Sequence, residues 1–412
     1  AGSVVYNKKQ REAIKTAVEK GILILTGGPG TGKTTTLRGI LRIFEEIGLD
    51  TALAAPTGRA AKRMSEVTRM EAKTIHRLLE AHPPAGFNKN EENPLKGDVL
   101  IVDECSMIDI LLMNSLLKAI PEEMTLILVG DVDQLPSVGA GKVLADILES
   151  GVVPFVKLDK IFRQAQYSKI VTNAHRINRG GYLELDDNNS DFIFLEETDT
   201  EKAADKIIEL CSEILPNNNN IPVDDIQVLT PMRRGPIGTE ILNKRLQDSL
   251  NPDGLALKRG FSEYRVNDRV MQIRNNYEKG VFNGDIGFIY DINTQSGNVV
   301  VAFEDEKKFV NYDVTDLDEI VLAYATTIHK SQGSEFPYVV MPIMMSHYIM
   351  LQRNLLYTGV TRAKSGLILL GEKRAVFFAV KNNKIVERNT KLAERLKRGR
   401  EYIALEKFEN ML

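Results

Sequence analysis

Eight consecutive residues near the N-terminus have the types and spacing of a phosphate-binding loop. Residues 27–34 read Gly-Gly-Pro-Gly-Thr-Gly-Lys-Thr and match G-x-x-x-x-G-K-[ST]. Such glycines let backbone N–H groups point into one concavity that holds phosphate oxygens, and a helix that begins there adds partial positive charge. Lys33 is predicted to reach the β- and γ-phosphates and Thr34 to bind Mg²⁺. The alternative is a glycine-rich turn without nucleotide. The predicted nucleotide contacts in this loop are Gly28, Gly30, Thr31, Gly32, Lys33, Thr34 and Thr35.

Two other apolar runs end in polar side chains that suit phosphoryl transfer. The run 99–102 is followed by Asp103 and Glu104. Asp103 is predicted to bind Mg²⁺, and Glu104 to act as the base that polarises the attacking water. Gln134 follows a later strand end and could hydrogen-bond both the γ-phosphate and that water. The alternatives are a solvated strand end for the two acids and an ordinary loop for Gln134.

The elements that must position these residues alternate in type along the first third of the chain. Strands are predicted at 22–26, 51–55, 99–102 and 125–129, and each is followed by a helical pattern. Alternating strands and helices favour an α/β fold with a parallel sheet covered on both faces. Strand-like runs return at 227–230, 321–325, 338–343 and 366–370, which predicts a second domain of the same kind.

Changes in composition and period set the expected domain boundaries. Acidic and turn-forming residues crowd after Gly180–Gly181, so residues 1–180 are predicted to form the first domain and 181–254 with 318–412 the second. Short β-like runs between 255 and 317 predict a small antiparallel barrel inserted into the second domain. The stretch 389–412 is predicted to be a charged surface helix.

Composition excludes several classes of protein. The chain has 412 residues, 43% hydrophobic and 26% charged, with a net charge of −3. That balance excludes a uniformly basic coat, so any polyanion site must be a local patch. No apolar run approaches the roughly 18 residues of a membrane span, and the polar N-terminus does not resemble a signal peptide. Cys105 and Cys211 are the only cysteines, which excludes a disulfide framework. A cytosolic location is expected, and the absence of an initiator Met suggests trimming.

Several further motifs occur in an order that resembles a known enzyme family. They are Ala55–Ala61 (APTGRAA), Thr74–Arg77 (TIHR), Gly130–Pro136 (GDVDQLP), Ile161–Gln164 (IFRQ), Ala325–Phe336 (ATTIHKSQGSEF) and Tyr357–Lys364 (YTGVTRAK). Together with the phosphate loop they resemble the motifs of superfamily 1 helicases, and most closely the RecD-like DNA helicases. The resemblance spans about residues 6 to 395. It implies two RecA-like domains with ATP and Mg²⁺ between them and an enzyme that hydrolyses ATP.

The resemblance also implies roles for single residues of the nucleotide site. Gln10 lies where the family places its adenine-reading glutamine. Arg163 and Arg362 match cations that face the γ-phosphate, which agrees with the need to neutralise charge that develops during transfer. Glu335 resembles a ribose or nucleotide contact. The alternatives are surface salt bridges for the two arginines and a purely structural role for Glu335.

Nucleic-acid contacts are likewise implied by the resemblance. The matching positions are Pro56, Thr57, Gly58, Arg59, Thr74, His76, Thr327, His329, Lys330 and Gln332. Residues 59–77 carry six basic residues against two acidic ones, which is the local footprint expected of binding along a phosphate backbone. A solvated helix face is the alternative. Single-stranded DNA and single-strand–duplex junctions are the expected partners, and a monomeric motor is expected.

A segment rich in proline suggests how strands could be separated. Residues 80–97 have no helical period, so they are predicted to project as a loop or short hairpin. Relatives carry a strand-separating pin at this place, and Phe87 could stack on the terminal base pair. A passive surface loop is the alternative. The RecD-like resemblance further implies 5′-to-3′ movement on DNA.

Three functions remain after this reading. The first is an ATP-dependent DNA helicase. The second is a catalytically weak DNA-binding P-loop module within a larger repair or conjugation protein; Lys33, Glu104 and Arg362 are all present, which disfavours it. The third is another P-loop machine, such as a hexameric clamp-loader type. Its arginine finger would come from a neighbouring subunit, whereas the candidates here lie in the same chain.

Overall fold

The computed structural model divides the chain into two compact units. It describes residues 5–82, 86–162, 165–185, 190–260, 262–303, 308–384 and 388–399. The first unit contains the chain up to Gln166 and again from Ile385, and the second contains Tyr167–Lys384. The expected boundary at Gly180–Gly181 is therefore too late, because α7 (Lys169–Asn178) packs against α10 and β20 of the second unit.

The first unit is built around six parallel strands in the order β3-β2-β6-β7-β1-β8. Its strands are β1 (Ile22–Gly27), β2 (Thr51–Ala55), β3 (Ala72–Thr74), β6 (Val99–Val102), β7 (Thr125–Gly130) and β8 (Phe155–Leu158). The four predicted strands of this domain are confirmed. Their continuous apolar runs fit because helices cover both faces of the sheet.

Alternating side chains of the strands divide the core of the first unit into two layers. Leu23 and Leu25 pack toward α1 and α2, whereas Ile24 packs toward α5 and α6, as the two-residue period of a strand requires. The helices are α1 (Lys8–Glu19), α2 (Lys33–Glu46), α3 (Gly58–Thr68), α4 (Ile75–Leu78), α5 (Ile110–Ala119) and α6 (Val143–Ser150), with short 3₁₀ turns at Cys105–Met107 and Ala165–Tyr167.

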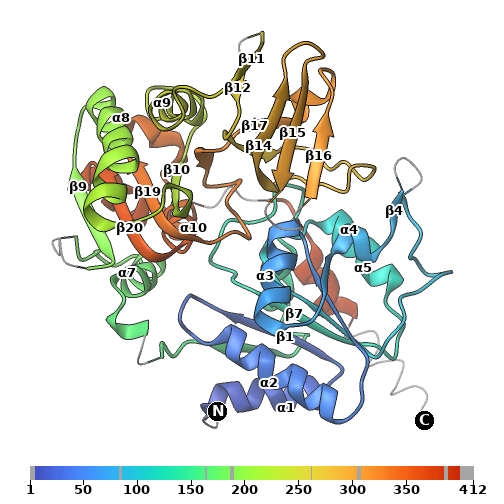
Figure 1. Ribbon diagram of the computed structural model, residues 1–412. Coiled ribbons are helices and arrows are strands. Elements are labelled where there is room, and N and C mark those ends of the chain that lie inside the picture. The colour runs from blue at the N-terminus through green and yellow to red at the C-terminus, as the bar shows by residue number, and fades with distance from the viewer. Residues whose placement is uncertain are drawn as a thin grey trace, which may run out of the picture. The chain divides into compact units, whose positions relative to one another are not determined.

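A small hairpin interrupts the first unit between α4 and β6. β4 (Ala81–His82) pairs antiparallel with β5 (Gly86–Phe87), so that Ala81 faces Phe87 and His82 faces Gly86. Figure 1 labels β4 of this hairpin. The segment 80–97 was expected to form a loop or short hairpin. Among its described residues, Ala81–His82 and Gly86–Phe87 form a short hairpin, and 88–97 follow as a loop. Residues 83–85, between the two strands, lie outside the described residues.

The second unit repeats the parallel-sheet plan. Five parallel strands lie in the order β18-β10-β19-β20-β9. They are β9 (Phe192–Glu196), β10 (Ile226–Thr230), β18 (Ala325–Thr327), β19 (Phe336–Ile343) and β20 (Ala363–Gly371). The helical elements are α7, α8 (Thr200–Glu209), a π-helical continuation (Leu210–Asn218), α9 (Thr239–Leu250), α10 (Arg353–Val360) and α11 (Lys373–Lys381), with 3₁₀ turns at Val223–Asp225, Asp316–Glu319 and Met345–Met350.

An antiparallel barrel is inserted between α9 and β18 of the second unit. Its five-stranded sheet has the order β16-β15-β14-β13-β17, and β11 pairs with β12 beside it. The strands are β11 (Ala256–Arg259), β12 (Ser262–Arg265), β13 (Arg269–Gln272), β14 (Ile286–Asn293), β15 (Asn298–Phe303), β16 (Lys308–Tyr312) and β17 (Ile320–Leu322). The run 321–325 was expected to be one strand of the parallel sheet. It is wrong in that form, because β17 pairs with β13 and only β18 pairs with β10.

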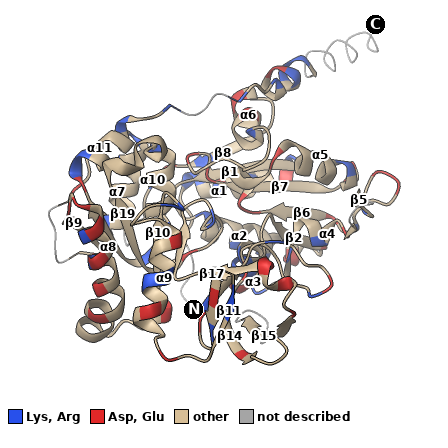
Figure 2. Cartoon of the chain, turned by 90° about the horizontal axis from the view of Figure 1, so that it is seen from above, with Lys and Arg blue, Asp and Glu red and all other residues tan. Residues whose placement is uncertain are grey.

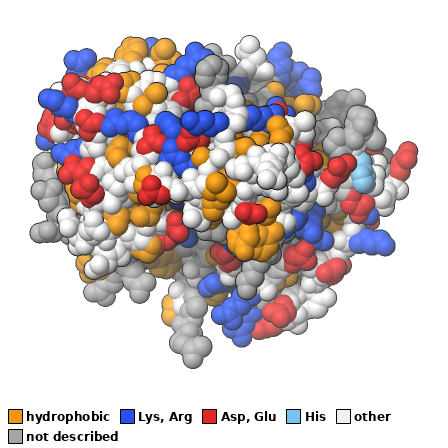
Figure 3. Space-filling model, turned by 45° about the horizontal axis from the view of Figure 1, so that its top comes forward, with side chains coloured by type: hydrophobic (Ala, Val, Ile, Leu, Met, Phe, Trp, Pro, Cys, Tyr) orange, Lys and Arg blue, Asp and Glu red, His pale blue; other side chains and the backbone are white. Residues whose placement is uncertain are grey.

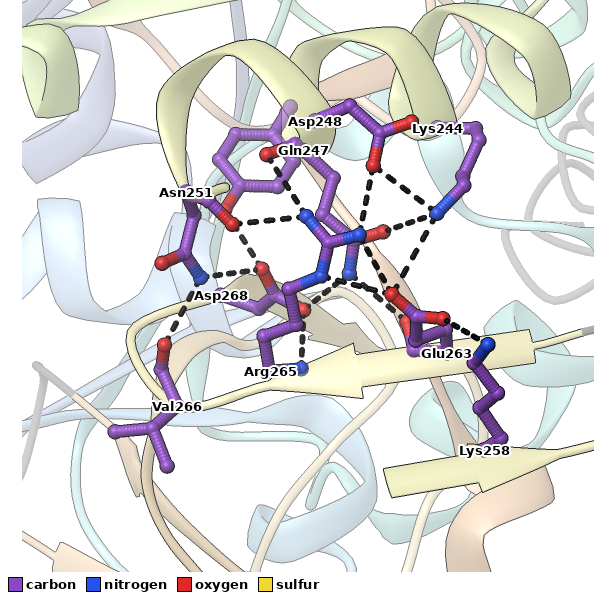
Figure 4. A network of polar contacts seen from close by, with 10 residues as sticks. Lys244, Gln247, Asp248, Asn251, Lys258, Glu263, Arg265, Val266 and Asp268 are labelled. Atoms are coloured by element: carbon purple, nitrogen blue, oxygen red, sulfur yellow. Dashed lines mark hydrogen bonds and ion pairs between the residues drawn. The ribbon is translucent and has the colours of Figure 1, made fainter. Parts of the chain in front are cut away.

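A buried polar network fixes this insertion to α9. The Asp268 carboxylate accepts hydrogen bonds from Gln247 Nε2 at 2.6 Å and Asn251 Nδ2 at 2.8 Å. The Arg265 guanidinium donates to Asp248 Oδ1 at 2.7 Å and Glu263 Oε1 at 2.6 Å. Figure 4 shows these side chains converging from α9 and its C-cap Asn251, from β12, and from Asp268 between β12 and β13. Helix and insertion are therefore one packing unit.

The surface of the protein carries both signs of charge. On the face drawn in Figure 3, lysine and arginine side chains are interspersed with aspartate and glutamate, in agreement with the small net charge. Among the described residues, no helix is long and apolar enough to span a membrane.

Candidate nucleotide and nucleic-acid sites

The loop after β1 has a backbone that only glycine tolerates well. Gly30 and Gly32 have φ of 68° and 84°, in the left-handed region that other residues rarely adopt. A Cβ on Gly32 would lie 2.4 Å from Phe162 Cε2. Gly32 is the N-cap of α2 and provides no side-chain hydrogen bond to the helix. The first N–H groups of α2 are thus left for an anion, as phosphate binding requires.

The side chains of the loop are arranged around the same concavity. Lys33 Nζ donates to the carbonyls of Gly27 and Gly28, so the ammonium lies against the phosphate loop itself. Thr31 is buried, and its Oγ1 donates to Gly28 O at 2.8 Å. Thr34 is exposed and Thr35 is half-buried. Exposure keeps the Thr34 hydroxyl accessible to a metal ion.

Two residues from outside the loop form hydrogen bonds with the carbonyl oxygens of its glycines. Gln10 is fully buried on α1, and its Nε2 contacts Gly32 O at 3.4 Å, while its Oε1 accepts from Asn7 N at 3.0 Å. Phe162 N donates to Gly30 O at 3.0 Å. The structure therefore places Gln10 beside the phosphate loop, and its role in reading adenine stays a prediction. Phe162 was not identified in advance, although its motif was.

The two acids after β6 form a coupled and strained pair. Asp103 Oδ1 accepts a hydrogen bond from Glu104 N at 2.8 Å. Burial and the neighbouring Glu104 raise the pKa of Asp103 to about 6, although Arg63 and Lys33 act in the opposite direction. Glu104 has a left-handed backbone with φ of 52°, a costly conformation for a residue with a side chain and one that often marks functional sites.

Arg63 is a member of this site that the sequence analysis misplaced. It was counted in the basic stretch 59–77, but its Nη1 lies 3.5 Å from Glu104 Oε1. This contact joins α3 to the end of β6 and could not be read from residues 41 positions apart. Within the same stretch, Lys62 Nζ lies 3.7 Å from Glu66 Oε1, so part of the basic charge is compensated.

Gln134 lies in the loop after β7, and the nitrogen of its side-chain amide is held by a neighbour. Its Nε2 contacts Asp131 Oδ2 at 3.4 Å, and both residues are buried. Its Oε1 has no hydrogen-bond partner within the described residues, and the same is true of Thr26 Oγ1 on β1. Buried acceptors are normally satisfied. An unpaired acceptor fits a bound water, which can donate to it. Asp131 is a second supporting residue that was not singled out from the sequence.

Of the two arginines predicted to act as cations, only Arg362 lies within the described residues. Arg163 lies outside the described residues. Arg362 is almost fully buried in the second unit; its Nη1 donates to Ser334 O at 3.0 Å and its Nε to Thr358 O at 3.2 Å. A surface salt bridge is therefore not its environment. Glu335, next to Ser334, lies 3.5 Å from Lys364 Nζ.

The predicted nucleic-acid residues of the second unit surround a tight turn after β18. Thr327 Oγ1 accepts from Lys330 N at 3.3 Å, and Lys330 Nζ donates to Asn283 Oδ1 of the insertion at 2.8 Å. Burial lowers the pKa of His329, and burial together with Arg233 lowers that of Lys330. Gln332 is buried. A cavity of about 720 Å³ opens beside this turn, and Thr326, Thr327, Lys330, Arg233, Lys244 and Tyr264 are among its lining residues.

The corresponding residues of the first unit lie at the start of α3 and α4. Thr57 caps α3 by accepting from Ala60 N at 3.3 Å, and Thr74 caps α4 by accepting from Arg77 N at 3.1 Å. Pro56, Gly58 and Arg59 are half-buried at the first of these ends. Because β2 and β3 are parallel neighbours, both helix starts lie at one edge of the sheet.

Phe87 occupies a different position from the one expected of a strand-separating wedge. It packs against the core of the first unit, and its ring centroid lies 5.7 Å from that of His76. It is at the base of the hairpin rather than at its turn. The aromatic ring beside it in the structure is that of His76, which is tilted by 49° and whose pKa burial lowers.

The fold and site together define a class of protein. A parallel α/β sheet with a phosphate loop after β1, acids after β6 and a glutamine after β7, followed in the same chain by a second parallel sheet of the same plan, is the architecture of a P-loop motor ATPase with two RecA-like domains.

Comparisons with known proteins narrow this class. The family described as AAA domain matches residues 10–140, the ATP-dependent RecD-like DNA helicase SH3 domain matches 242–303, and the UvrD-like helicase C-terminal domain matches 322–370. The second of these ranges begins within α9, consistent with the network that joins α9 to the insertion. The chain is 32% identical over 426 residues to the RecBCD enzyme subunit RecD of Mycolicibacterium smegmatis, covering 95% of this chain and 75% of that one. The chain belongs to the RecD family of helicases.

Other relatives agree with this assignment. The ATP-dependent RecD2 DNA helicase of Deinococcus radiodurans is 36% identical over 391 residues, which cover 95% of this chain; the chain spans about half (52%) of that relative's length. Among solved structures, the Pif1 helicase of Candida albicans superimposes with a TM-score of 0.55 at 18% identity, over 97% of this chain and all of that one. A structure described as two coordinating Pif1 helicases at forked double-stranded DNA has a TM-score of 0.55 at 20% identity, covering 89% and 92% of the two chains. At this identity the structural likeness supports the fold.

Proposed function

We propose that this chain is a motor that couples ATP hydrolysis to 5′-to-3′ movement along single-stranded DNA and thereby unwinds duplex. The observation that carries the proposal is the uncapped, left-handed glycine loop in one unit with Asp103, Glu104 and Gln134, whose Oε1 has no partner within the described residues. We take the class of reaction, ATP-dependent unwinding of DNA, from membership of the RecD family.

The nucleotide site is proposed to work through residues of the first unit. Bound ATP and Mg²⁺ would supply the phosphoryl group and neutralise its charge. Lys33 and the N–H groups of α2 hold the phosphates, and Gln10 reads the adenine. Thr34 and Asp103 fit Mg²⁺ because hydroxyl and carboxylate oxygens are its preferred ligands. Gly28, Gly30, Thr31, Gly32 and Thr35 complete the proposed contacts.

Turnover is proposed to depend on one base, one sensor and two cations. Glu104 accepts the proton of the attacking water, and Arg63 holds its carboxylate in place until then. Gln134 Oε1 orients that water while Asp131 fixes the other end of the amide. Arg163 and Arg362 are the proposed cations that stabilise developing charge, and Glu335 the ribose contact. To act, the Arg362 guanidinium must exchange its carbonyl partners for phosphate oxygens.

Single-stranded DNA is the proposed track. Helix starts at one edge of the first sheet and the turn after β18 in the second unit carry the proposed contacts, which are Pro56, Thr57, Gly58, Arg59, Thr74, His76, Thr327, His329, Lys330 and Gln332. A solved Pif1 structure of similar fold is described as bound to single-stranded DNA, which supports this proposal. We propose that the hairpin of β4 and β5 meets the duplex, with Phe87 supporting it through His76 rather than stacking on a base pair.

The relatives suggest two settings for such a motor. One is described as the RecD2 DNA helicase and others as a subunit of the RecBCD enzyme. We propose a monomeric motor for this chain, because both cation candidates lie in the same chain as the phosphate loop.

An unwinding assay tests the proposal directly. The chain is mixed with duplexes that carry a 5′ tail, a 3′ tail or no tail, in DNA and in RNA, with ATP and Mg²⁺. We expect strand release from the 5′-tailed DNA only, and none with the Lys33→Ala variant. Release from the 3′-tailed duplex alone would contradict the proposed 5′-to-3′ direction. Release without ATP would contradict the proposed ATP-driven motor.

A further inference from the structure

A short segment that follows the second unit returns to the first and contacts the loop after Gln134. The second unit ends at Lys384, and residues 388–399 belong to the first unit. Figure 2 shows this C-terminal stretch beside α6. It was expected to be a charged surface helix with no chemistry. That expectation is incomplete, because the segment is anchored to the first unit through three kinds of contact.

The strongest of these contacts is made by Arg388. Its Nη1 donates to Gly139 O at 2.8 Å and Gly141 O at 2.5 Å, and its Nη2 donates to Ser137 O at 2.7 Å. Nη1 also lies 3.3 Å from Ser137 Oγ. One planar guanidinium thus bridges three carbonyl oxygens of the loop 137–141. A lysine ammonium, as a single point donor, could not span them in the same way.

The next two contacts hold the rest of the segment. Thr390 Oγ1 donates to Asp146 Oδ2 of α6 at 2.7 Å, and Asp146 is almost fully buried. Leu392 and Leu396 pack against the core cluster that lies under α5 and α6. Their spacing of four residues places both on one face of the helical turn at 392–399.

The loop that Arg388 holds has little freedom elsewhere. Ala140 O accepts from Ile110 N at 2.9 Å, and a Cβ on Gly139 would lie 2.1 Å from Asp109 Oδ2, so the backbone lies tightly against the start of α5. Ser137 is buried. Gln134 precedes Ser137 by only three residues, one of which is Pro136. A shift of loop 137–141 would therefore move the Gln134 side chain.

We infer that Arg388 is a positioning residue for ATP hydrolysis, which holds loop 137–141 so that Gln134 faces the attacking water. This inference rests on the proposed function of the site. The segment that carries Arg388 is continuous in sequence with the second unit, whose last residue is Lys384, and it contacts the sensor loop through hydrogen bonds.

The test compares three variants of the whole chain: Arg388→Ala, Arg388→Lys and the control Arg395→Ala. Arg395 is an exposed arginine of the same segment. Steady-state ATPase with single-stranded DNA gives kcat and the KM for ATP, and hydrogen–deuterium exchange reports on residues 131–142. A displaced catalytic group costs up to about 100-fold in rate, so we expect Arg388→Ala to lower kcat by roughly tenfold or more with little change in KM. Arg388→Lys should fall between Arg388→Ala and the parent.

The exchange measurement separates positioning from general stability. We expect faster exchange in residues 131–142 for Arg388→Ala but not for Arg395→Ala, with both variants folded at the assay temperature. A kcat for Arg388→Ala equal to that of Arg395→Ala overturns the inference, as does a loss confined to KM or to the melting temperature. If the parent chain itself fails to hydrolyse ATP, the proposed function falls as well; an active parent with an equally active Arg388→Ala overturns the inference alone.

Discussion

At the carboxyl edge of the first sheet, β1 runs into left-handed glycines, and buried acceptors on Thr26 and Gln134 have no partner within the described residues. At the carboxyl edge of the second sheet, β18 runs into a turn stabilised by its own side chains, and nearby Arg362 donates to two backbone carbonyls. At the first edge the N-terminus of α2 has no side-chain cap, whereas at the second edge Thr327 caps its own turn and Arg362 stays paired with carbonyls. Unpaired buried atoms occur at both edges, because Thr326 Oγ1 on β18 also has no partner within the described residues. The contrast between the edges is therefore the open glycine loop, and we expect that loop to receive the ligand.

Arg362→Ala is the change with the largest expected effect on this contrast. If Arg362 becomes the cation of the transition state, kcat for DNA-stimulated ATPase should fall by about 10³–10⁵ while nucleotide binding persists. The matched control is Arg353→Ala, which removes another arginine that donates to a backbone carbonyl, Val380 O at 2.7 Å. Both changes leave a carbonyl unsatisfied, at about 1–3 kcal/mol. A drop in kcat below tenfold for Arg362→Ala would assign it to stability alone.

Glu104→Gln tests the chemistry of the first edge. The amide keeps the shape of the side chain but accepts no proton, so kcat should fall by about 10²–10⁴ with ATP still bound. The control Glu66→Gln changes an exposed acid on α3 that pairs with Lys62 and should behave like the parent. Rapid-quench measurement of a single turnover checks the chemical step. Turnover by Glu104→Gln at the parental rate would mean that another group takes the proton.

Arg265→Ala should weaken the second unit without touching the first. It removes the cation between Asp248 and Glu263 in the network of Figure 4, and breaking a largely buried pair costs on the order of 3 kcal/mol. Lys258→Ala is the control, because Lys258 is an exposed partner of Glu263 and should cost under about 1 kcal/mol. Urea unfolding of each variant, followed with nucleotide binding, checks this. If the folded Arg265→Ala variant lost nucleotide binding, the nucleotide site of the first unit would depend on the second unit, contrary to this prediction.

The Arg265 pair also predicts a dependence on pH. A hydrogen bond from Arg265 is the main reason why the pKa of Glu263 lies below its ordinary value of 4.5. The unfolded chain therefore takes up this proton first, so the stabilisation is complete above pH 4.5 and is lost as the pH falls through the lowered pKa. The gap in unfolding free energy between parent and Arg265→Ala should narrow in acid. A constant gap would show that packing, rather than charge, accounts for the effect.

The smallest expected effect concerns the DNA contacts of the two edges. Arg59→Ala and Lys330→Ala should each reduce the slope of log affinity against log salt by about 0.7 for a single-strand phosphate contact. Arg42→Ala, which removes an exposed arginine paired with Glu46 on α2, is the control. Fluorescence anisotropy at several salt concentrations gives the slopes. An unchanged slope for Arg59→Ala alone would restrict the track to the second unit.

The features that could be predicted from the sequence are those formed by residues close together in the chain. The phosphate loop, the acids after 99–102 and the strand positions follow from local spacing and period. Arg63 beside Glu104, Phe162 beside Gly32 and Arg388 on loop 137–141 depend on which strands become neighbours, and no local pattern encodes that. The run 321–325 misled for the same reason. Its residues are uniformly apolar, yet Ile320–Leu322 and Ala325–Thr327 enter different sheets.

That division of one apolar run has a mechanical consequence. Only Ala323 and Tyr324 lie between β17 of the insertion and β18 of the parallel sheet, and Gln227 Nε2 donates to the carbonyls of both, at 3.2 and 3.0 Å. At its other end the insertion is fixed to α9 by the network around Arg265. Because both attachments are stiff, we expect a force on the outer strands of the insertion to be transmitted to β18 and the turn after it rather than absorbed by a flexible linker. We therefore expect the insertion to move as a rigid body with β18. A force on a DNA strand bound to the insertion would then displace the residues proposed to contact DNA.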